Sequence, residues 1–122
     1  MEIWNRSFRH HLCRRRRYGN KFECGFTCRC GNRIHWKGTW ERVCIENELV
    51  TVRVTGRGRS FDTVVAQSEW GDFICIPSHD IGFSIGSFSD TARLEEHFRK
   101  NLGQEDAITV AAALKSMERE SE

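Results

Sequence analysis

No apolar run in this sequence approaches the ~20 residues that cross a bilayer, so we expect no membrane partner. Residues 1–17 are polar and arginine-rich, and they lack the apolar core that a secretory signal peptide carries. We therefore expect the chain to work in the cytoplasm, a reducing compartment where disulfides are disfavoured. With 122 residues, the sequence predicts one domain.

The motifs of the common hydrolases are also missing. We find no Ser, His and Asp in the chain order of a catalytic triad, no nucleophile elbow and no zinc-deaminase signature. The stretch at 56–59 (GRGR) has two glycines but no following Lys-Ser/Thr, so it does not form a P-loop and reads as a hairpin tip. His79 and Asp80 are adjacent, and neighbours on a turn usually point apart. We therefore predict a binding protein and not an enzyme.

The charge that is present is unevenly distributed. Residues 1–60 hold 14 Lys/Arg against 5 Asp/Glu, whereas residues 61–122 hold 5 against 12. The two halves thus carry +9 and −7 within a net charge of +2. Such a chain either presents its two halves to different partners or neutralises itself on folding.

Cysteine is concentrated in one stretch. Cys24, Cys28 and Cys30 fall within seven residues, and crowded thiolates of this kind suit a tetrahedral zinc ion (Zn²⁺). All three reach one metal only if the chain folds back at residues 25–27, because an extended strand keeps Cys24 far from Cys30. Ordinary reduced thiols and a disulfide are the alternatives. We predict a structural zinc.

A tetrahedral zinc site needs a fourth ligand, and the candidates lie on either side of the cysteine cluster in the sequence. Cys13 lies upstream, and we favour it because it ties the basic arm to the core. His10 and His11 are alternatives, as is His35. A two-residue turn at Gly31-Asn32 places His35 across from Cys28.

Period-two alternation dominates residues 21–77 and predicts a five-stranded antiparallel meander. Beyond Pro77, residues 78–89 read as a connection that packs on the sheet. Two helices follow, and their apolar residues recur every three or four positions. The expected fold is α+β: a basic arm (1–20), a β-meander (21–77), then a connection and two helices (78–122) that cover one face of the sheet.

Two binding functions fit this organisation. In the first, the chain is a small zinc-containing nucleic-acid-binding protein whose basic half contacts phosphates and whose tryptophans stack on bases. The residues for that function are Arg14, Arg15, Arg16, Arg17, Arg53, Arg57, Arg59, Trp36 and Trp40. In the second, the chain is an inhibitor or adaptor that binds a protein through its charged faces.

Four stretches carry a resemblance that favours the second function. They are residues 28–40, 73–77 (FICIP), 87–90 (SFSD) and 107–114 (AITVAAAL). Together they resemble small proteins of bacterial mobile elements, and among these the chain is similar to metal-binding anti-CRISPR proteins directed at type II-A systems. The similarity spans roughly residues 21–118.

The resemblance implies a non-enzymatic inhibitor in the bacterial host cell. It implies binding to the recognition lobe of a type II RNA-guided effector nuclease, a block of target DNA loading, and weak or no direct nucleic-acid binding. It also implies structural zinc, with Cys24, Cys28 and Cys30 carried over as ligands.

An acidic C-terminal half is suited to compete for the basic channel of such a nuclease. We predict that the partner-binding residues lie on the two helices. They are Glu95, Glu96, Glu118 and Glu120.

Overall fold

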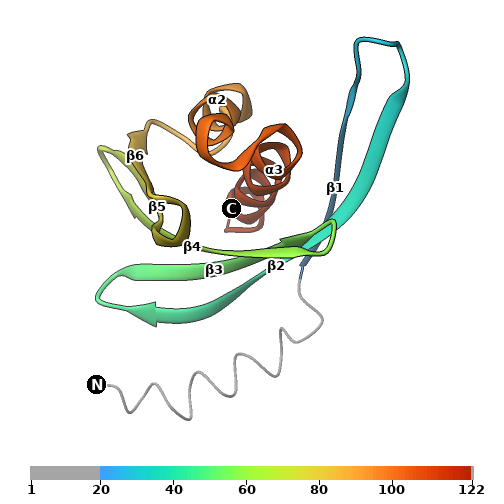
Figure 1. Ribbon diagram of the computed structural model, residues 1–122. Helices are drawn as coiled ribbons and strands as arrows, with labels where there is room; N and C mark the ends of the chain where they lie inside the picture. Colours follow the sequence, from blue (N-terminus) through green and yellow to red (C-terminus); the bar gives the residue numbers. More distant parts are fainter. Residues whose placement is uncertain (1–19, 122) are drawn as a thin grey trace.

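The computed structural model describes residues 20–121, with side chains described as far as residue 118. One antiparallel sheet curls around two helices (Figure 1). The strands pair in chain order and are β1 (Asn20–Thr27), β2 (Arg33–Glu46), β3 (Leu49–Gly56), β4 (Arg59–Ser68), β5 (Gly71–Ile76) and β6 (Ile81–Ile85). The helices are α2 (Thr91–Leu102) and α3 (Gln104–Ser121), and a short 3-10 turn, η1 (Pro77–His79), joins β5 to β6.

The predicted α+β class and the two C-terminal helices are confirmed, but the sheet formed by residues 20–85 has six strands and not five. The additional strand, β6, lies in the stretch that we had assigned to a connection. Asp80 adopts a left-handed conformation with φ of 55°, which reverses the chain after η1. Ile81 and Ile85 then point into the core, so the period-two pattern continues past Pro77.

The core fills the space between the concave face of the sheet and the helices. Alternate residues of the central strands, such as Val52 and Val54 in β3, are fully buried. Leu94 and Phe98 of α2 are also fully buried, as the four-residue spacing predicted. Helix α3 contacts β1, β2 and β3, whereas α2 contacts β6 and α3. No helix among the described residues is long and apolar enough to span a membrane.

Strands β1 and β2 form a long hairpin that projects from the rest of the sheet (Figure 1). Its turn differs from the predicted one. The N–H of Cys28 donates to the carbonyl of Asn32, and the N–H of Gly31 donates to the carbonyl of Cys28. His35 consequently pairs with Gly25 and not with Cys28. Because the register differs by an odd number of residues, His35 lies on the opposite face of the sheet from the expected one.

Candidate functional site

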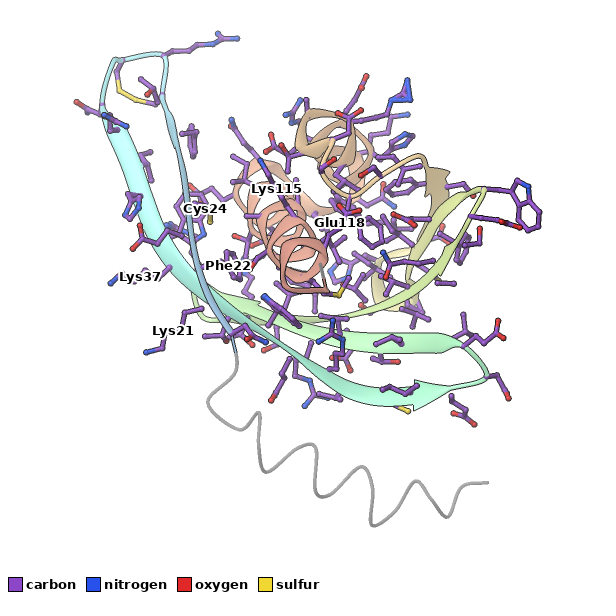
Figure 2. The ribbon with its side chains drawn as sticks, turned by 180° about the vertical axis from the view of Figure 1, so that it is seen from behind. Lys21, Phe22, Cys24, Lys37, Lys115 and Glu118 are labelled. Carbon is purple, nitrogen blue, oxygen red and sulfur yellow. A yellow bond between two sulfur atoms is a disulfide. The ribbon has the colours of Figure 1, made fainter. Side chains whose placement is uncertain are left out.

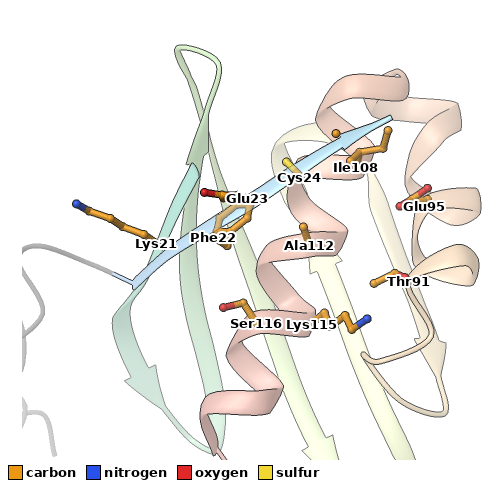
Figure 3. A pocket seen from close by; sticks show the side chains of 11 residues that line it. Lys21, Phe22, Glu23, Cys24, Thr91, Glu95, Ile108, Ala112, Lys115 and Ser116 are labelled. Carbon is orange, nitrogen blue, oxygen red and sulfur yellow. The ribbon is translucent and has the colours of Figure 1, made fainter. Parts of the chain in front are cut away.

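A groove separates the free edge of β1 from the two helices (Figure 3), and we call it the β1 groove. Its volume is about 730 Å³, within the range of ligand-binding clefts. Five consecutive residues of β1 form one side, and residues of α2 and α3 form the other. The lining residues are Lys21, Phe22, Glu23, Cys24, Gly25, Thr91, Glu95, Ile108, Ala112, Lys115 and Ser116.

The backbone of β1 faces this groove with unpaired polar groups. Among the described residues, strand β1 pairs only with β2 and forms an edge of the sheet. In an antiparallel ladder, residues alternate between hydrogen-bonded pairs and pairs whose N–H and C=O groups point away from the partner strand. The Cys28–Asn32 hydrogen bond of 2.9 Å sets this alternation, so Cys24 bonds to Trp36 across the hairpin. The N–H and C=O of Lys21 and Glu23 therefore point outward from β2, towards the groove.

Thr109 of α3 links the helix to β1 and β2 through hydrogen bonds to side chains on their inner face. Its hydroxyl accepts the indole N–H of Trp36 at 2.8 Å and donates to the carbonyl of Glu105 at 2.9 Å. It also hydrogen-bonds the thiol of Cys24. A Cβ added at Gly56 would lie 2.7 Å from the Thr109 methyl carbon, so glycine permits this close approach of β3 to α3.

Of the cysteines in the described part of the chain, Cys24 alone lines the β1 groove. Burial raises the pKa of its thiol to about 11, and the hydrogen bond with Thr109 opposes this shift only in part. At neutral pH the thiol is therefore protonated, which makes it a small packing residue and a poor nucleophile.

The predicted partner-binding glutamates face different neighbours. Glu95 lines the β1 groove, where burial raises its pKa and Arg99, 3.9 Å away, opposes that shift. Glu96 is exposed on α2. Glu118 of α3 accepts hydrogen bonds of 3.2 and 3.3 Å from the Ser87 hydroxyl. The side chain of Glu120 lies outside the described residues.

Glu118 also belongs to a carboxylate pair that the sequence did not reveal. Asp72 of β5 is only 6% exposed. Burial raises the pKa of Asp72, the negative charge of Glu118 raises it further, and a hydrogen bond from the backbone of Phe88 opposes both effects. Because Ser87 and Phe88 lie in the β6–α2 connection, this pair holds that connection between the sheet and α3. Only the fold brings these distant residues together, since no local motif marks them.

Of the predicted zinc ligands, the structure brings together Cys28 and Cys30. They form a disulfide at the tip of the β1–β2 hairpin, with their Cα atoms 5.3 Å apart (Figure 2). We had expected reduced thiols here, and the bond forms because the tight turn places the two side chains against each other. Cys24 remains free. Residues 25–27 continue β1 without folding back, so four residues of strand, about 13 Å, separate Cys24 from Cys28.

The other candidate ligands do not complete a cluster within the described part of the chain. His35 hydrogen-bonds Glu23 at 3.2 Å on the exposed face of the hairpin. Cys13, His10 and His11 lie outside the described residues. Between residues 20 and 118, no three His, Cys, Asp or Glu side chains gather as a metal site would require. Of the predicted ligands in the described residues, only Cys28 and Cys30 thus lie close enough to share a metal.

Within the described residues, each arginine that was a candidate for phosphate contacts is paired with an acidic side chain, whereas Arg14 to Arg17 lie outside these residues. Arg53 donates to Asp62 at 2.9 and 3.3 Å. Arg57, in the β3–β4 turn, lies 2.9 Å from Glu105, and Arg59, the first residue of β4, donates to Asp106 at 2.8 Å. Glu105 and Asp106 are in the first turn of α3, where acidic residues also complement the helix dipole.

The two tryptophans that were candidates for base stacking are buried, so that prediction is wrong. Trp40 has no exposed surface, and its indole N–H donates to the Ser116 hydroxyl at 3.1 Å. Trp36 is 8% exposed, and the guanidinium of Arg57 lies over its ring at 5.0 Å. The amphipathic pattern of β2 marks both residues as inward-facing, and this was the signal against stacking.

A comparison with protein families matches residues 20–122 to a model described as "Family of unknown function (DUF6618)". No curated protein and no solved structure matches the chain.

Proposed function

The chain belongs to the DUF6618 family, and from that premise we propose that it is a non-enzymatic protein-binding inhibitor. We propose as its target a type II RNA-guided effector nuclease, in keeping with the anti-CRISPR resemblance of the sequence. Binding to the recognition lobe would then prevent target DNA from loading.

One observation favours a protein partner over nucleic acid. The described arginines and tryptophans that were candidates for nucleic-acid contacts make intramolecular contacts instead. Arg53, Arg57 and Arg59 each have a carboxylate within 2.9 Å. A neighbouring carboxylate offsets the attraction of an arginine for phosphate. Trp36 and Trp40 donate their indole N–H groups to α3. The nucleic-acid alternative therefore depends on Arg14, Arg15, Arg16 and Arg17, which lie outside the described residues.

Gel filtration of the chain with the effector nuclease and its guide RNA tests the proposal. We expect a discrete stoichiometric complex, and only weak binding to free duplex DNA that disappears as salt is raised. As a control, neutralising Arg14 to Arg17 should leave the protein complex intact. Tight duplex binding at physiological salt without a protein complex would reverse the choice and favour the nucleic-acid function.

We assign the predicted structural zinc to the reduced form of the hairpin tip. Cys28 and Cys30 would supply two thiolates, and further ligands would come from Cys13, His10 or His11. Zinc and the disulfide then exclude each other, because both require the same sulfur atoms.

Elemental analysis under reducing and oxidising conditions checks this assignment. We expect about one zinc per chain after reduction and none after oxidation. Cys28→Ser and Cys30→Ser should lose the metal, whereas Cys24→Ser should keep it because β1 holds that residue apart. Full zinc content in both hairpin variants would contradict the assignment.

A further inference from the structure

We infer that the free edge of β1 binds one extended segment of a partner protein, which adds to the sheet as a further strand inside the β1 groove. This inference rests on the proposed function only in taking the partner to be a protein. The observation behind it is that this edge, which has no second partner strand between residues 20 and 121, runs along a groove whose opposite wall is made of helices.

The edge offers backbone groups at a regular spacing. Lys21 and Glu23 occupy positions where the N–H and C=O point away from β2, and Gly25 is the next such position along β1. An incoming strand can pair with these groups as a neighbouring strand would, which is a recurring mode of peptide recognition. At Gly25, a Cβ would run into the carbonyl oxygen of Ile34, so glycine is needed to keep β1 and β2 paired there.

The groove admits a single segment more readily than the edge of another sheet. Thr91 and Glu95 of α2, with Ala112 and Ser116 of α3, border it opposite β1. A second copy of the chain would bring its own β1 together with its own helices, and these would meet the helical wall. An isolated extended segment has no such bulk.

Charge indicates the chemistry of that segment. Successive side chains of a strand alternate between the two faces, so Lys21 and Glu23 flank the edge on the face opposite to the buried Phe22. In Figure 3, Lys21 extends away from the helices. Charges along an edge disfavour indiscriminate pairing with other sheets. They favour a strand that places an acidic residue beside Lys21 and a basic residue beside Glu23.

Amide hydrogen exchange of the full chain tests whether the edge is open. In the free protein, the amides of Lys21, Glu23 and Gly25 should exchange fast, whereas those of Phe22 and Cys24 should be protected by β2. Protection of all five amides in the free protein would overturn the inference, because a second copy or the chain's own N-terminal segment would then cover the edge.

Proline at an outward-facing position tests whether the edge binds. Proline lacks the N–H donor, and an edge strand tolerates it where that N–H does not bond to the sheet. Glu23→Pro should leave the fold intact and weaken binding to the effector–guide complex at least about tenfold, the loss expected from one or two backbone hydrogen bonds. Glu23→Ala removes the same carboxylate and its bond to His35 but keeps the N–H, so it is the matched control for the lost charge and should weaken binding much less than Glu23→Pro. Lys21→Pro, at the next outward-facing position, should behave like Glu23→Pro.

The outcomes separate this inference from the proposed function. If the wild type and both proline variants bind the effector equally, the proposed function stands and the edge inference is wrong. If no form of the chain binds the effector, the proposed function fails. A short synthetic peptide that alternates threonine and valine, with an aspartate and a lysine two positions apart, then decides the inference. Binding that Glu23→Pro abolishes and that Glu23→Ala weakens only slightly would support it, and no binding would overturn it.

Discussion

Replacing Trp40 with alanine is expected to lower the free energy of unfolding by about 3–5 kcal/mol, the usual cost of truncating a large buried aromatic residue. Trp40 belongs to β2, and its fully buried side chain packs against α3. The replacement leaves a cavity at this contact and leaves the hydroxyl of Ser116 without its indole donor. A domain of ordinary stability would lose a large share of its folding free energy.

Trp70 provides a matched control of the same residue type. It is 86% exposed at the turn between β4 and β5. Trp70→Ala should change the free energy of unfolding by no more than about 0.5 kcal/mol. Urea denaturation followed by circular dichroism measures both variants, and equal losses would contradict the packing described for Trp40.

Under the proposed function, protein added before target DNA is expected to block DNA binding by the effector nuclease, whereas protein added after DNA has loaded should be at least about tenfold less potent. The reason is competition, since a loaded heteroduplex already occupies the basic channel that accepts it through its backbone. Inhibition should also be stoichiometric. A filter-binding or gel-shift assay in both orders of addition measures the difference. Equal potency in both orders, or many nuclease molecules inactivated by each inhibitor, would refute the mechanism.

Of the four glutamates predicted to bind the partner, Glu96 gives the clearest test of that prediction. Glu96 is exposed on α2, so Glu96→Lys should weaken inhibition without disturbing the fold. Glu118→Lys is less informative because Glu118 accepts hydrogen bonds from Ser87 and lies beside Asp72. Glu46→Lys, at the exposed end of β2, makes the same charge change on a remote hairpin and should leave inhibition unchanged. Equal loss of inhibition in the Glu46 and Glu96 variants would indicate an effect of net charge alone.

Local patterns in the sequence determined the fold class. Alternation along residues 21–77 predicted the meander because side chains of a strand alternate between its faces. The four-residue spacing of Leu94 and Phe98 predicted the buried side of α2. The sixth strand was missed because Gly82 and Gly86 occupy exposed positions of an alternating stretch, and glycine is typical of a connection.

Only the tertiary structure decided how distant residues combine. The hairpin turn set the register that moved His35 to the face opposite the expected one, and the same turn joined Cys28 to Cys30 while β1 kept Cys24 apart. The basic first half is neutralised in part by the acidic second half, through pairs such as Arg59 with Asp106. The sequence alone determined that opposite charges were present in the two halves. Which of them meet depends on contacts across 47 residues of chain, and those contacts exist only once the helices have packed inside the curled sheet.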